Sequence, residues 1–85
     1  MTYRVVLSPA AARELRKLDA HTKRRIQAAI ELLTETPRPP AAKRLVDSGG
    51  AWRVRVGEYR IVYDIDDGEL VVLVLHTRHR RDSYR

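Results

Sequence analysis

The segment spanning residues 52–63 limits the fold most strongly, because apolar and polar residues alternate on both sides of a Gly-Glu pair at positions 57 and 58. Alternation indicates two strands, since successive side chains on a strand point to opposite faces of the sheet. A glycine-first pair is typical of a two-residue hairpin turn. Counting outward from that turn pairs Arg55 with Arg60 and places Arg53 on the same face. The predicted hairpin therefore has one apolar face and one face with three guanidinium groups.

Arginines that face each other across two strands need an explanation. Like charges placed directly opposite destabilise a sheet by up to about 1 kcal/mol. Either the face is simply solvated, or it binds an anion. The chain has 17 Lys and Arg against 11 Asp and Glu, with a formal net charge of +6. Nearly all of the positive charge is arginine, whose planar fork grips phosphate with two hydrogen bonds. We expect a polyanionic partner, with nucleic acid as the first candidate and an acidic protein as the second.

Length and composition point to one small domain that occupies residues 1–85. The chain contains no cysteine, which excludes disulfides and thiolate metal sites and suits the reducing cytoplasm. No segment has the pattern of a signal peptide, and no apolar run approaches the roughly 20 residues that span a bilayer. We therefore expect a cytoplasmic protein without a membrane partner.

The first half of the chain predicts a strand followed by two short helices. Residues 2–7 form the strand, and Ser8 then caps a helix that has proline at its first position. Asp19 caps a second helix, in which apolar residues recur at helical spacing. The prolines between residues 37 and 40 end that helix. Residues 41–51 are then a connection.

The second half predicts a meander of strands at residues 52–56, 59–65 and 69–76. The last strand is apolar on both faces, as expected at the centre of a sheet. A two-residue turn at Asp67 and Gly68 would place Leu75 beside Arg60. Tyr59 and Tyr63 share the apolar face and are interpreted as core residues. The fold class is α+β in a small single domain, with the order β-α-α-β-β-β and an α-hairpin packed on a curved, mainly antiparallel sheet.

The run from residue 76 to residue 85 forms a second basic cluster that contains histidines and a tyrosine. Such a run is often only a solvated tail, but the predicted hairpin would bring it to the arginine face, where cations and an aromatic ring suit RNA. His79 is the candidate for proton transfer, because imidazole gains and loses a proton between pH 5 and 8. His76 is interpreted as structural. The carboxylates around the last hairpin turn are interpreted as solvated turn residues, so we expect no metal and no cofactor.

The arginine hairpin and the closing His79-to-Tyr84 segment resemble the RelE toxins of bacterial toxin–antitoxin systems. The resemblance covers almost the whole chain and implies the RelE-like microbial RNase-type fold. Members of this type cleave mRNA, typically in the ribosomal A site, by attack of the RNA's own 2′-hydroxyl and without a metal. The resemblance also implies a RelB-like antitoxin as the protein partner, the ribosome and mRNA as targets, and operator DNA only through the antitoxin complex.

The resemblance assigns roles to single residues. Arg60 and Arg80 would clamp the scissile phosphate, and Tyr84 would stack on a base. Arg53 and Arg55 stand where the family often has lysines, one of them the general base. Arginine does not readily lose a proton, so these two residues are expected to act electrostatically. Further RNA contacts are expected from the remaining basic residues near the hairpin and the tail, namely Lys43, Arg44, Arg78, Arg81 and Arg85.

Two other functions stay open. The related ParE toxins share the fold, lack the RNase residues and inhibit DNA gyrase without catalysis, and the arginines that replace lysines fit that alternative. A catalytically weak RNA-binding module would use the same basic face without turnover.

Overall fold

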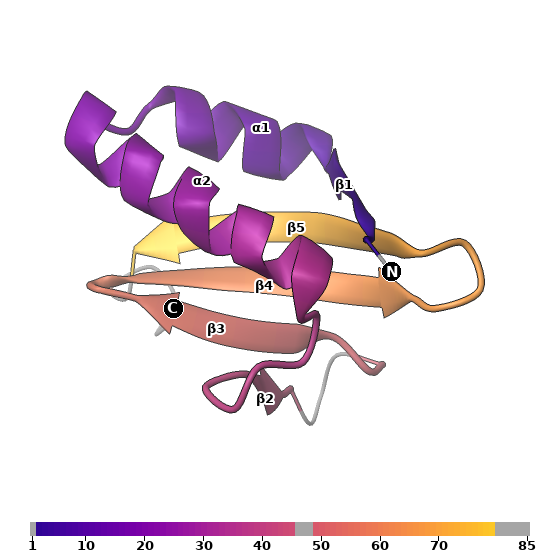
Figure 1. Ribbon diagram of the computed structural model, residues 1–85. Coiled ribbons are helices and arrows are strands. Elements are labelled where there is room, and N and C mark those ends of the chain that lie inside the picture. Colours follow the sequence, from indigo (N-terminus) through magenta and orange to yellow (C-terminus); the bar gives the residue numbers. More distant parts are fainter. Residues whose placement is uncertain (1, 46–48, 80–85) are drawn as a thin grey trace.

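The computed structural model describes residues 2–45 and 49–79, within which two helices and five strands form a two-layer fold (Figure 1). The elements follow in the order β1 (Arg4–Leu7), α1 (Pro9–Arg16), α2 (Ala20–Glu35), β2 (Lys43–Arg44), β3 (Trp52–Val56), β4 (Tyr59–Asp66) and β5 (Val71–His79). The strands form one sheet in the order β1-β5-β4-β3-β2, in which β1 and β5 run parallel and the other neighbours run antiparallel. Both helices lie on the same side of the sheet. The predicted α+β class is confirmed.

Both helices begin at the predicted caps. The Ser8 hydroxyl accepts a hydrogen bond from the Ala11 amide at 3.0 Å, and Pro9 occupies the first turn of α1. The Asp19 carboxylate accepts from the amide and the hydroxyl of Thr22 at 3.1 and 2.6 Å. These side chains satisfy amides that lack a partner within the helix, so the sequence sets both helix starts locally.

The core lies between the two helices and the helix-facing side of the sheet. Its fully buried members include Ile26, Ile61 and Tyr63. The Tyr63 hydroxyl donates to the Pro37 carbonyl at 2.7 Å, and burial raises the pKa of Tyr63 to about 12. Tyr59 packs against the same cluster. The interpretation of both tyrosines as core residues is confirmed.

The hairpin of β3 and β4 has the predicted register along its whole length, including the Arg55–Arg60 pair. Gly57 adopts a φ of +59°, which glycine tolerates because it lacks a Cβ atom. Alternation and turn chemistry together therefore determined this register.

The predicted register of β4 and β5 is wrong. Asp66 pairs with Val71, so four residues form the turn instead of two, and the Asp66 carboxylate accepts from the Glu69 amide within it at 3.0 Å. The strand pair is then irregular at residues 62 and 63, and Leu75 is skipped between the partners of these two residues. The Leu75 carbonyl instead accepts from the Ser8 hydroxyl at 2.7 Å. As a result Arg78, and not Leu75, lies opposite Arg60.

Several further boundaries differ from the prediction. The first strand begins at Arg4, two residues later than expected. The connection predicted for residues 41–51 contains β2, a two-residue strand that pairs with β3. β5 begins at residue 71 and continues to His79, beyond the predicted end at residue 76. The longer β5 brings the start of the basic C-terminal run into the sheet.

Asp67 ties the β4–β5 turn to two distant segments. Its carboxylate accepts from both terminal nitrogens of Arg38 at 3.2 and 2.9 Å and from the Tyr3 hydroxyl at 2.7 Å. These hydrogen bonds, with that of Arg38 the largest contributor, lower the pKa of Asp67 to about 2. Hydrogen bonds to a carboxylate favour its charged form, so the contacts hold the turn while Asp67 is ionised.

We expect Asp67→Asn to weaken the acid sensitivity of the fold. The pKa of Asp67 is lower in the folded state than in the unfolded state, so its stabilisation is present above about pH 4 and is lost as the pH falls toward 2. Urea unfolding at a series of pH values should show a shallower loss of stability below pH 4 in the variant. Asp64→Asn, which changes an exposed carboxylate on the same strand pair, serves as the control and should keep the wild-type acid dependence. An identical acid dependence in the wild type and in Asp67→Asn would contradict this assignment.

Candidate functional site

Three arginines lie in a line across the sheet face that the helices leave open. Arg60 on β4 pairs with Arg55 on β3 and with Arg78 on β5. Directly paired residues share a face, and neighbouring strands lie about 4.8 Å apart. We call Arg55, Arg60 and Arg78 the arginine row. It contains two successive like-charge pairs, each of which destabilises the sheet by itself.

A second line of residues runs beside the arginine row on the same face. Lys43 on β2 pairs with Arg53, which pairs with Val62, which in turn pairs with His76 on β5. Together with the arginine row, Lys43 and Arg53 form a surface that we call the basic face. Five cations from four strands therefore share one side of the sheet, which can bind an extended polyanion such as a nucleic acid backbone.

Two predicted site residues belong to the opposite, helix-facing side. His79 pairs with Tyr59, and their rings meet edge to face with centroids 5.2 Å apart. Arg44 pairs with Trp52, and its guanidinium carbon lies 5.8 Å from the centre of the indole ring. Strand alternation directs these two residues away from the hairpin arginines, so His79 does not converge with them as expected, and the RNA contact predicted for Arg44 would have to be made from the other face.

The predicted contributions of the C-terminal run divide into two groups. Arg78 joins the basic face through its pairing with Arg60. The other predicted site residues of this run, Arg80, Arg81, Tyr84 and Arg85, lie outside the described residues.

Glu14 on α1 is a contributor that sequence reasoning missed. One oxygen of its carboxylate accepts from the Thr77 amide at 3.0 Å and lies 3.4 Å from Nδ1 of His76. The other oxygen lies 3.6 Å from Nε of Arg78. Glu14 therefore holds β5 at the edge where β1 has ended and places a negative charge beside the arginine row. The sequence signal was an acidic residue at a position next to the apolar stripe of α1, between Ala11 and Leu15.

The site offers charge rather than a metal centre in the part of the chain that is described. Within residues 2–45 and 49–79, no three His, Asp or Glu side chains gather in a way that could hold a metal ion. Neither helix in these ranges is long and apolar enough to cross a membrane.

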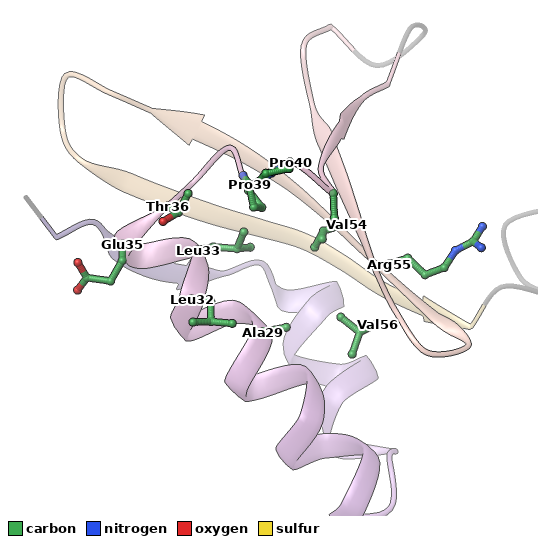
Figure 2. A pocket seen from close by; sticks show the side chains of 11 residues that line it. Ala29, Leu32, Leu33, Glu35, Thr36, Pro39, Pro40, Val54, Arg55 and Val56 are labelled. Carbon is green, nitrogen blue, oxygen red and sulfur yellow. The ribbon is translucent and has the colours of Figure 1, made fainter.

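An apolar groove of about 460 Å³ lies on the helix side, between the end of α2, residues 39–41 and β3. Figure 2 shows Val54 and Val56 directed toward α2, whereas Arg55 between them points away. Leu32, which is 70% exposed, lines the outer part of the groove. Strand alternation thus separates the apolar groove from the basic face.

Comparisons with known proteins agree with this geometry. The family model described as "ParE toxin of type II toxin-antitoxin system, parDE" matches residues 5–84. Two curated Mycobacterium tuberculosis proteins are each 33% identical to this chain: Toxin RelE, over 98% of this chain and 87% of its own length, and Toxin RelG, over 100% and 99%.

Solved structures of similar fold include two toxin–antitoxin complexes. The RelE–RelB complex of Pyrococcus horikoshii has a TM-score of 0.82 and 27% identity, and the match covers 94% of this chain and 97% of the other. The RelBE2 complex of Mycobacterium tuberculosis has a TM-score of 0.81 and 29% identity, with 94% and 100% covered.

Proposed function

This chain belongs to the RelE/ParE superfamily, the toxins of type II toxin–antitoxin systems, and on that premise we propose that it is an endoribonuclease that cuts mRNA on the ribosome. The observation that carries the proposal is the arginine row on the open face of the sheet. The names of the two curated relatives, RelE and RelG, favour the ribonuclease over gyrase inhibition of the ParE type.

The arginine row would bind the scissile phosphate of the mRNA. In the proposed reaction the 2′-hydroxyl of one nucleotide attacks its own 3′-phosphate, and negative charge builds up on the phosphate oxygens. Arg55, Arg60 and Arg78 come from three paired strands, so the sheet fixes the spacing of their backbones before RNA binds. Donors that are already in place stabilise developing charge without reorganisation, and one such donor is worth about 10²–10³ in rate.

Arg53 and Lys43 would hold the RNA next to the scissile phosphate. These two residues pair with each other across β2 and β3, in the line of residues beside the arginine row. Single-stranded RNA needs cations that follow its backbone, and arginine binds phosphate with two parallel hydrogen bonds. Binding and charge stabilisation therefore have separate residues on the same face.

The tail would complete the site. Arg80 is proposed as a second phosphate clamp and Tyr84 as a stacking surface for a base, while Arg81 and Arg85 would add phosphate contacts. Stacking on Tyr84 would hold an unstacked base in the orientation that cleavage requires.

A RelB-like antitoxin is the proposed protein partner. The two similar solved complexes each pair a RelE-type toxin with its antitoxin. With a formal net charge of +6, this chain would attract an acidic or amphipathic antitoxin that blocks the basic face. Operator DNA would be contacted only through the antitoxin in the complex.

We expect the purified protein to cut mRNA on ribosomes programmed with a defined A-site codon. The variants Arg80→Ala and Tyr84→Ala should lose cleavage but keep most of their affinity for the programmed ribosome. Toeprinting would map the cuts, and co-sedimentation with ribosomes that carry uncleavable mRNA would measure binding. Retained binding without cleavage supports an enzyme. A parallel loss of binding and cleavage would favour an RNA-binding module instead, and intact mRNA with the folded wild-type protein would direct attention to gyrase.

A further inference from the structure

His76, and not His79, is the histidine on the open face of the sheet. It pairs with Val62 of β4, in the line next to the Arg60–Arg78 pair. Its Nε2 atom lies 3.4 Å from a terminal nitrogen of Arg78. The side chain is 33% exposed, so one edge of the ring is accessible. The bulge at Leu75 and the extended β5 produce this placement, and the sequence pattern did not predict either feature.

The neighbours of His76 determine which ring nitrogen carries the proton in neutral imidazole. Nδ1 is buried and makes no hydrogen bond to the described residues, but it lies 3.4 Å from the Glu14 carboxylate, an anion that favours a proton on the nearer nitrogen and can only accept. Nε2 faces the Arg78 guanidinium, which can only donate. The proton therefore belongs on Nδ1, and the lone pair on Nε2 is directed toward the basic face. A carboxylate that orients an imidazole in this way leaves the far nitrogen ready to accept a proton.

Glu14 is itself held in place. The oxygen near His76 also accepts from the Thr77 amide, the next residue of β5, and the other oxygen lies beside Arg78. One carboxylate thus connects the strand edge, the imidazole and a member of the arginine row. The charged groups that face His76 are Glu14 from α1 and Arg78 from its own strand, while β4 places the apolar Val62 opposite.

We propose that His76 is the general base of the cleavage reaction and that Glu14 is its positioning residue, an inference that rests on the proposed endoribonuclease function. As the RNA phosphate binds Arg78, Nε2 of His76 takes the proton of the attacking 2′-hydroxyl. The bond between O2′ and phosphorus forms while the bond between phosphorus and O5′ breaks. The leaving 5′-oxygen takes a proton from water, and the products are a 2′,3′-cyclic phosphate and a 5′-hydroxyl.

His76 would supply the proton acceptor that the hairpin of β3 and β4 lacks. Arg53 and Arg55 stay charged at neutral pH and cannot accept a proton. His79 lies on the other face against Tyr59. Among residues 2–45 and 49–79, His76 is the only histidine on the face that carries the arginine row.

The test is a comparison of histidine variants in single-turnover cleavage of mRNA on programmed ribosomes across pH 6–8.5. We expect His76→Gln to lower the rate by about 10²–10⁴-fold, the usual contribution of a general base. A reaction that uses a general base should speed up with rising pH and then level off in the wild type, and the variant should lose that bend in the profile. Binding of mRNA with a 2′-deoxy group at the cut should not change. Glu14→Gln should give a smaller loss of rate, because the imidazole remains but loses the carboxylate that orients it.

Two further variants make the test selective. His21→Gln on α2 is the matched control and should keep the wild-type rate and pH profile. His79→Gln tests the rival histidine. The inference would be overturned if His76→Gln kept the wild-type dependence of cleavage rate on pH, or if His79→Gln lost that dependence instead. Either result would leave the proposed endoribonuclease function intact. A wild-type protein that cuts no mRNA at any pH would overturn both the proposed function and this inference.

Discussion

Arg60→Ala is expected to lower the rate of mRNA cleavage by about 10²–10³-fold without loss of the fold. Arg60 is the central member of the arginine row, between Arg55 and Arg78. Its removal also relieves two like-charge pairs. The free energy of unfolding should therefore stay the same or rise by up to about 1 kcal/mol. Single-turnover cleavage on programmed ribosomes and urea unfolding measure the two effects on the same preparation.

Arg24→Ala provides the matched control for Arg60→Ala. Arg24 is an exposed arginine on α2, on the helix side of the sheet, so the control removes the same charge from the other side of the molecule. Its cleavage rate should stay close to that of the wild type. Equal losses of cleavage in the two variants would mean that net charge matters and that the arginine row has no special role.

Unlike Arg60→Ala, Ile61→Ala is expected to destabilise the fold, with a loss of about 2–5 kcal/mol in the free energy of unfolding. Ile61 follows Arg60 directly on β4, but its side chain points to the other face and is 0% exposed in the core. The smaller side chain leaves a cavity that the packed layers only partly fill. Urea unfolding monitored by circular dichroism should show a lower midpoint with an unchanged slope.

Val62→Ala is the control for Ile61→Ala, because the next side chain along β4 lies on the open face. Val62 is only partly buried there, so its truncation should destabilise the fold clearly less. Equal destabilisation by the two truncations would contradict the assignment of the core to the helix-facing side.

The sequence predicted those parts of the fold that local chemistry determines. The caps at Ser8 and Asp19 and the turn at Gly57 each depend on residues that are close in the chain, and each is confirmed. The predicted register of β5 was wrong for a physical reason. Its first half is apolar on both faces, so a slip of one residue leaves the apolar pattern unchanged, and the carbonyl of Leu75 at the bulge accepts a hydrogen bond from Ser8, the N-cap residue of α1.

The basic face was only partly predictable for the same reason. The pairing of Arg55 with Arg60 followed from one hairpin, whereas the positions of Arg78 and His76 depend on the longer turn and the bulge. Glu14 reaches them from a helix 62 to 64 positions earlier in the chain, at sequence separations that no local pattern encodes. The roles of Arg80 and Tyr84 stay predictions.

The most direct test of the proposed function is to map mRNA cleavage on programmed ribosomes, with the 2′-hydroxyl at the cut either present or replaced by hydrogen. We expect a cut within the A-site codon of the normal mRNA, product ends with a 2′,3′-cyclic phosphate and a 5′-hydroxyl, and no cut in the 2′-deoxy mRNA. A cut that persists without the 2′-hydroxyl, or normal mRNA that stays intact with the folded protein, would contradict the proposed function.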